Sequence, residues 1–115
     1  MIGERQIQEI LAQYKKHGWS LRRVLLSESI EERLAATLFG QTEIVSSEIN
    51  ALWFSRASFE GRETWELRSL SETPFALVEV FETEDEDAVR DEAREEMETR
   101  MSEQASKLRG GKGTG

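Results

Sequence analysis

The sequence predicts an α+β fold, and three observations lead to it. Three strand-like runs at residues 51–58, 63–70 and 75–82 are separated only by short turn segments, which predicts an antiparallel meander spanning 51–82. Apolar residues with helical spacing come before this block, and they predict two N-terminal helices on one face of the sheet. A long charged segment with helical spacing follows it and predicts a C-terminal helix.

The first helix is expected where apolar residues recur on one helical face, at Ile7, Ile10, Leu11 and Tyr14. Gly18 supplies its stop, because glycine readily adopts the backbone conformation that ends helices. His17 lies in the last turn, where positive charge suits the helix dipole, and we interpret it as a C-terminal capping residue. Residues 19–26 become rich in β-forming residues toward their end and predict one earlier strand.

A short second helix is expected after that strand. Residues 29–32 have the pattern of a capping box, apolar residues follow on one helical face, and Gly40 closes the segment. Residues 41–50 are ambiguous, and within them residues 43–45 form either a short strand or an ordered loop.

The turns of the meander predict which residues pair. If residues 60–61 form a two-residue turn, Phe54 lies opposite Leu67. If residues 71–74 form a four-residue loop, Leu67 lies opposite Val78. The two registers agree on one core face, which the N-terminal helices are expected to cover. That face comprises Leu52, Phe54, Trp65, Leu67, Ala76, Val78 and Val80.

The opposite face is expected to be mixed in character, and it holds the candidate binding residues: Trp53, Glu66, Arg68, Glu79 and Phe81. The predicted register places Trp53 opposite Arg68, which permits cation–π stacking. It places Glu66 opposite Glu79, a like-charge pair that needs a nearby cation. Either this face is a solvated surface partly covered by the C-terminal helix, or it is a binding surface rich in the residue types of interface hot spots.

The C-terminal helix is expected to begin at a capping box, residues 83–86, and to end near Leu108. Its apolar residues follow one another in near four-residue steps: Val89, Ala93, Met97, Met101, Ala105 and Leu108. A helix of this length outreaches a small domain, so Met97 and Met101 are expected at or near a contact in a homodimer. The single domain then spans residues 1–108, and the glycine-rich segment 109–115 is expected to be disordered.

Composition excludes several kinds of chemistry. The chain has no cysteine and one histidine, so disulfides, thiolate catalysis and histidine-rich metal sites are excluded, and no catalytic residue, metal site or cofactor is assigned. The net charge of −8 repels phosphates and anionic lipids, so neither nucleic acid nor membrane binding is expected. The charged N-terminus has no apolar run after it, which predicts no signal peptide, and a cytoplasmic location is expected.

One short pattern faintly resembles that of PD-(D/E)xK nucleases, in residues 50–53 followed by 65–68. The family places an acid before one strand and Glu-x-Lys on the next, for a divalent metal and an activated water. Asn50 stands where the first acid belongs, and Arg68 stands where the lysine belongs, so two of three positions depart from the pattern.

Two functional hypotheses follow. The first is a non-enzymatic protein-interaction module, such as a small acidic adaptor, regulator or chaperone-like protein, that binds a protein partner or itself. The alternative is a degenerate or weak metal-dependent enzyme, nuclease-like, that uses carboxylates on the sheet. The missing cysteines, the single histidine and the absence of a glycine-rich phosphate loop favour the first.

Overall fold

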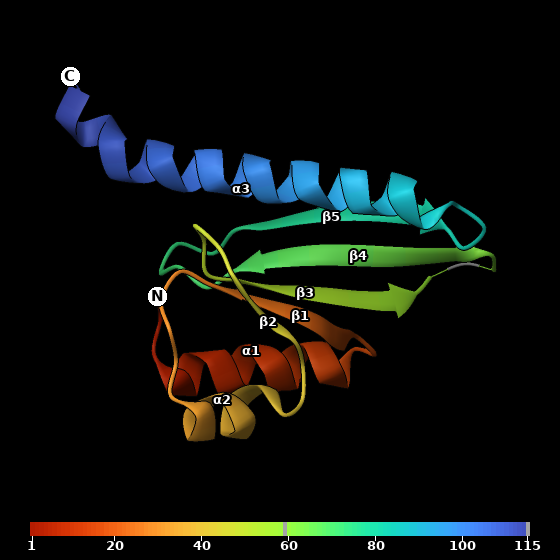
Figure 1. The fold of residues 1–115 in the computed structure, drawn as a ribbon, viewed down its shortest axis with the longest axis horizontal. Helices are drawn as coiled ribbons and strands as arrows, with labels where there is room; N and C mark the ends of the chain where they lie inside the picture. Colours follow the sequence, from red (N-terminus) through yellow and green to blue (C-terminus); the bar gives the residue numbers. More distant parts are fainter. Residues whose placement is uncertain (59, 115) are drawn as a thin grey trace.

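The computed structural model describes residues 1–58 and 60–114, with side chains as far as Lys107 apart from position 59. The described chain has the predicted α+β class, with helices on both sides of one sheet (Figure 1). The elements in chain order are α1 (Glu4–Lys16), β1 (Ser20–Leu26), α2 (Glu32–Phe39), β2 (Ile44–Ser46), β3 (Ala51–Ala57), β4 (Arg62–Ser69), β5 (Ala76–Glu82) and α3 (Asp87–Thr114).

The sheet has the strand order β2-β1-β3-β4-β5, so β2 and β5 are its edges. β3, β4 and β5 form the predicted antiparallel meander, and β1 pairs with β3, also antiparallel. The ambiguous segment contains a strand, because Val24 of β1 pairs with Ile44 of β2 in a parallel ladder. The sheet is therefore mixed, with one short parallel edge beside a larger antiparallel part.

The N-terminal helices cover one side of the sheet, as predicted (Figure 1). Ile7 of α1 is 2% exposed and packs against Val24 and Leu52 in the first of two hydrophobic cores. His17 is the C-cap residue, as the sequence predicts, and its ring Nδ1 lies 2.9 Å from the Gln13 carbonyl oxygen. The next residue, Gly18, has φ of 85°, the left-handed conformation in which helices commonly end.

α3 lies along the other side of the sheet, and its C-terminal end extends past the strands (Figure 1). It begins at Asp87, not at the capping box expected at residues 83–86. The residues of that pattern serve the preceding turn instead: Thr83 Oγ1 donates to the Gly61 carbonyl (3.2 Å), and Asp85 accepts from the Glu82 amide (3.1 Å). The helical backbone continues to Thr114, beyond the end expected at Leu108, and disorder of 109–115 in solution stays a prediction.

Both hairpin registers differ from the predicted ones by one residue. In the first hairpin the Ser58 amide donates to the Arg62 carbonyl (3.2 Å), so three residues connect the paired positions instead of two. Gly61 has φ of 77°, the left-handed conformation that three-residue hairpin loops require. In the second hairpin the Ser69 amide donates to the Phe75 carbonyl (2.9 Å), so five residues connect the pair instead of four.

Because of these two register shifts, the side chains of β3 and β5 lie on the opposite faces of the sheet, relative to those of β4, from the faces predicted. Leu67 pairs with Trp53 rather than with Phe54, and with Leu77 rather than with Val78. A shift of one residue moves every side chain of a strand to the other face. Trp65 and Leu67 therefore share a face with Trp53, on the side that α3 covers, and the single core face predicted from the sequence does not exist.

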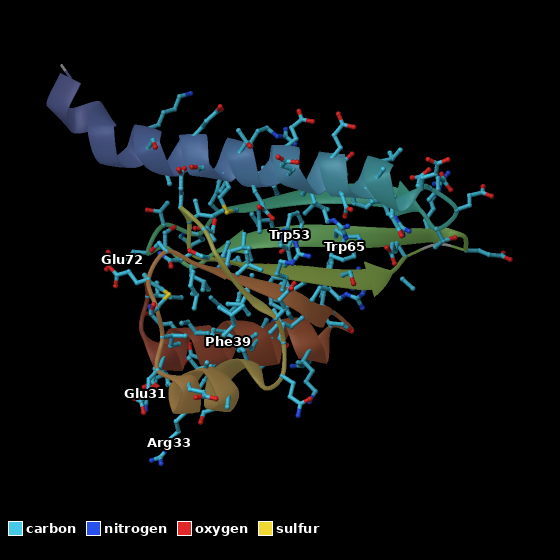
Figure 2. The ribbon with its side chains drawn as sticks, in the orientation of Figure 1. Glu31, Arg33, Phe39, Trp53, Trp65 and Glu72 are labelled. Carbon is cyan, nitrogen blue, oxygen red and sulfur yellow. The ribbon has the colours of Figure 1, made fainter. Side chains whose placement is uncertain are left out.

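The sheet instead separates two hydrophobic cores. Beneath α1 and α2, the buried core residues are Ile2, Ile7, Val24, Leu26, Leu38, Phe39, Leu52, Phe54 and Leu70. Beneath α3, they are Leu25, Ile49, Ala51, Trp53, Trp65, Leu67, Phe81, Met97 and Met101. Figure 2 shows Trp53 and Trp65 on the sheet beneath α3 and Phe39 among the N-terminal helices on the other side.

Candidate binding groove

The five residues predicted to form a binding surface do not share one face. Trp53 and Phe81 are buried beneath α3, at 1% and 5% exposure, and belong to the second core. Glu66 lies on the α1 side, where its carboxylate accepts a hydrogen bond from the Tyr14 hydroxyl. Arg68 is two residues further along β4 and lies on the same side. Glu79 pairs across the strands with Trp65 and is exposed, so the expected pairings of Trp53 with Arg68 and Glu66 with Glu79 are wrong.

The tryptophans beneath α3 serve the fold. Their rings meet edge to face at 6.0 Å, and each indole Nε1 donates a 2.7 Å hydrogen bond, from Trp53 to Glu98 and from Trp65 to Glu63. Arg94 of α3 stacks over the Trp65 ring at 4.5 Å from its centroid. Stacking of a cation on tryptophan is therefore present, at Trp65 rather than at Trp53. The Trp53–Glu98 and Arg94–Trp65 contacts fasten α3 to the sheet.

Met97 and Met101 also belong to this core. They are 1% and 2% exposed and pack against the sheet of their own chain. Both side chains therefore face their own sheet, and a homodimer with its contact near them stays a prediction. The narrow apolar stripe in the middle of α3 faces the sheet, whereas the prediction places this part of the helix beyond the body of the domain.

An open surface lies on the α1 side, above β4 and β5. Tyr14 of α1 stacks on Phe54 at 3.9 Å between ring centroids and donates its hydroxyl hydrogen to Glu66. Burial raises the pKa of Tyr14 above its usual value; the hydrogen bond to Glu66 and the charge of that carboxylate raise it further, whereas Arg68 lowers it. The tyrosine therefore stays protonated and acts as a fixed donor that orients Glu66.

Arg68 lies beside this pair and is incompletely satisfied. Its Nε is buried and has no hydrogen-bond partner among the described residues. An unpaired buried donor is costly. A hydrogen bond from this donor to an acceptor on a ligand would therefore be more favourable than one from a solvated arginine. Arg68 lines a hollow of about 510 Å³ between α1 and the loop after β4, together with Gln13, Tyr14 and Glu72. A smaller hollow continues along α1 to Trp19 and Glu66.

Two exposed valines of β5 lie on the same face of the sheet as Glu66. Val78 pairs with Glu66 and Val80 pairs with Thr64, so both point to the α1 side. Each is 52% exposed, because α1 and α2 lie near β1 and β2 and away from β5 (Figure 1). Both valines are predicted from the sequence to lie in the core, and that prediction is wrong. The hollow beside Tyr14, Glu66 and Arg68, together with the adjoining exposed valines Val78 and Val80, is called the β4–β5 groove below.

The far wall of the groove is held by a cation–aromatic contact. Arg56 stacks over Trp19 at 4.8 Å from the ring centroid and donates to the His17 carbonyl oxygen (2.9 Å). Arg56 thus fixes the end of α1 to β3. Sequence reasoning missed Tyr14, Val78 and Val80 as groove residues; the available signal was that the last strand of a meander lies at a sheet edge.

The residues of the nuclease-like pattern have other partners. Asn50 Oδ1 accepts hydrogen bonds from the Ser27 amide (2.9 Å) and hydroxyl (3.2 Å), and Glu66 is engaged by Tyr14. Within the described part of the chain, no three His, Asp or Glu residues come close enough together to hold a metal ion. None of the described helices has an apolar stretch sufficient to span a membrane.

The groove is interpreted from its own geometry, because the chain matches no protein-family model, no curated protein and no solved structure. Its components are exposed aliphatic side chains, an unsatisfied arginine donor and a tyrosine–glutamate pair on rigid elements. This combination provides apolar contact and oriented polar contacts side by side, as binding surfaces do.

Proposed function

We propose that this chain is a non-enzymatic protein-interaction module and that the β4–β5 groove is its binding surface. The observation that carries the proposal is the exposure of Val78 and Val80, each 52%, near the buried Nε of Arg68, which has no hydrogen-bond partner in the described part of the chain. An exposed apolar patch with an unsatisfied donor at its border is unfavourable in water. The free energy falls when a complementary surface covers the patch and supplies an acceptor to the donor. A protein surface offers the aliphatic side chains and carbonyl or carboxylate oxygens that this patch lacks.

The rest of the molecule supports the same function. Because α3 packs on the opposite face of β4 and β5, their exposed face can bind without refolding. The net charge of −8 keeps the module soluble and favours partners with basic surfaces.

The experiment uses two single substitutions by a photo-crosslinking residue, one at Val78 and one at Val89 of α3. Val89 is a matched control because it is 53% exposed, as large as Val78, and lies outside the groove. We expect a discrete adduct from position 78 in cells that express the chain, and none from position 89. The purified partner should then bind a Val78→Asp/Val80→Asp variant at least tenfold more weakly and a Val89→Asp variant unchanged. Equal adducts at both positions, or equal affinities of both variants, would overturn the proposal.

A further inference from the structure

β5 is a sheet edge whose outward backbone groups can be assigned residue by residue. The Ser69 amide donates to the Phe75 carbonyl, and the Thr83 amide donates to the Gly61 carbonyl. Both pairs belong to the same register as β4–β5, so the odd-numbered residues of β5 direct their backbone groups to β4. In an antiparallel ladder the alternate residues direct theirs to the other side. Ala76, Val78 and Val80 therefore present amide and carbonyl groups at the free edge.

This edge has defined ends. At its C-terminal end the Asp85 carboxylate accepts a hydrogen bond from the Glu82 amide (3.1 Å), which satisfies the next outward donor. At its N-terminal end Pro74 precedes the strand and has no amide hydrogen to donate. The unpaired stretch is therefore limited to residues 76–80, and it carries the two exposed valines of the groove on the same residues that present free backbone groups.

The charges around this edge are acidic. Beyond its C-terminal end the segment 82–87 carries five carboxylates, at Glu82, Glu84, Asp85, Glu86 and Asp87. Two neighbouring arginines are already paired, Arg62 with Glu82 and Arg90 with Asp87. Two copies of the chain pairing edge to edge would bring like charge together at both ends, since Glu72 lies near the other end of β5. A basic partner is favoured over a second copy.

We infer that the β5 edge binds an extended segment of a partner protein by adding it as a sixth strand, antiparallel to β5. The segment has apolar residues at alternate positions, to lie against Val78 and Val80, and basic residues at its N-terminal end, to lie beside residues 82–87. Main-chain hydrogen bonds to Ala76, Val78 and Val80 supply affinity, and the alternate apolar side chains supply specificity. This inference rests on the proposed function and names the kind of partner that the β4–β5 groove accepts.

The free protein offers a first measurement. We expect the amides of Val78 and Val80 to exchange their hydrogen with solvent much faster than those of Leu77, Glu79 and Phe81, which bond to β4. A probe peptide then tests binding: two lysines followed by four repeats of valine and threonine, acetylated and amidated at its ends. In saturating peptide we expect the amides of Val78 and Val80 to become at least tenfold slower in exchange.

Methylation of the peptide backbone separates strand addition from other binding. N-methylation of the valine amides, which would face β5, should weaken binding at least tenfold, and N-methylation of the threonine amides should leave it within about twofold. Moving the lysines to the C-terminal end should also weaken binding at low salt, because they would then lie away from the acidic segment.

Each outcome decides between the two proposals. If Val78→Asp/Val80→Asp abolishes binding but neither methylation pattern matters, the groove binds side chains only, and strand addition is overturned while the proposed function stands. If the peptide does not bind at millimolar concentration, or binds equally well with the lysines at either end, the basic antiparallel strand is overturned. Concentration-dependent self-association that protects the same amides would assign the edge to a second copy, and would also overturn it.

Discussion

The two sides of the sheet are completed in different ways. On the α3 side the aromatic side chains Trp53, Trp65 and Phe81 are buried, and both indole N–H groups have carboxylate partners. On the α1 side the helices complete a core over β1 and β3, but two valines of β5 are half exposed and a buried arginine donor has no partner among the described residues. The first side is a covered core, and the second is the one on which we propose contact with another molecule.

This difference explains why the long helix is part of the domain. α3 contributes Met97 and Met101 to the second core, so β4 and β5 would lose their cover without it. Because one face of these strands is held rigidly by α3, the other face can remain partly open without loss of the fold. Substitutions on the two sides should therefore differ in kind, with large losses of stability on one side and small losses on the other.

The largest effect is expected for Trp53→Ala, which should lower the free energy of unfolding by about 3–5 kcal/mol, the usual cost of truncating a buried large aromatic residue. The substitution also leaves the partly buried Glu98 without its indole donor. Urea denaturation followed by circular dichroism measures the change. Trp19→Ala, on the partly exposed wall of the groove, is the control and should cost less. Equal losses for the two variants would contradict the contrast between the two sides.

Met97→Ala should be next, at about 2–5 kcal/mol, because it leaves a cavity between α3 and the sheet. Val89→Ala on the same helix is the control, since Val89 is exposed, and it should stay within about 0.5 kcal/mol of the wild type. Light scattering should give the same molecular mass for wild type and both variants. A Met97→Ala protein of unchanged stability and reduced mass would instead place Met97 at a contact between copies.

Much of the fold could be predicted from sequence because its signals are local. The α1 periodicity with Gly18, the meander and the apolar stripe of α3 each depend on residues close together in the chain, and all appear in the structure. The register could not be obtained in this way. Gly61 suits a two-residue or a three-residue turn, and an error of one residue in each hairpin gave two registers that agreed with each other and were both wrong.

The candidate site was only half predicted for the same reason. Glu66 and Arg68 were named correctly as neighbours on one face of β4, because alternation within a strand does not depend on register. The residues that lie next to Glu66 come from other elements: Tyr14 belongs to α1, and Val78 belongs to β5. The side chains that lie beside Glu66 depend on the strand register and on the position of α1 on the sheet. Local sequence patterns determine neither of these.

A smaller effect is expected for Tyr14→Phe, which keeps the stacked ring and removes the hydroxyl. Loss of a hydrogen bond to a charged acceptor should cost about 1.5–3 kcal/mol, and less to the extent that water reaches Glu66. Tryptophan fluorescence during urea titration measures it. Tyr14→Leu is a second variant, which should cost more because it also removes the stacking on Phe54. Identical stabilities of Tyr14→Phe and wild type would mean that the Tyr14–Glu66 bond only orients the carboxylate.

The same residue gives a pH dependence with a definite sign. The pKa of Tyr14 is raised in the folded state, so the unfolded chain loses this proton first as pH rises. The contribution of Tyr14 to the free energy of unfolding is therefore complete below pH about 10 and should fall as the pH rises above that value. The slope for one proton is about 1.4 kcal/mol per pH unit, and Tyr14→Phe should lack this component. Tyr14 is the sole tyrosine, so tyrosinate absorbance reports it alone, and its ionisation should coincide with unfolding. Ionisation near pH 10 in the folded protein would show that Tyr14 is not shielded.

The smallest effect on stability is expected at Arg68. Arg68→Met keeps the aliphatic stem and removes the buried Nε that has no partner, so the free energy of unfolding should change by less than about 1 kcal/mol, or even rise. Arg22→Met on the α3 side is the matched control: Arg22 is exposed and lies 5.5 Å from the centroid of the Trp65 ring, a contact worth about 0.5–1 kcal/mol at an exposed site. Arg68→Met should weaken binding of the valine–threonine peptide at least fivefold, whereas Arg22→Met should leave it unchanged. A loss of more than about 2 kcal/mol in Arg68→Met would make Arg68 a structural residue, and the groove would then have no group set aside for a partner.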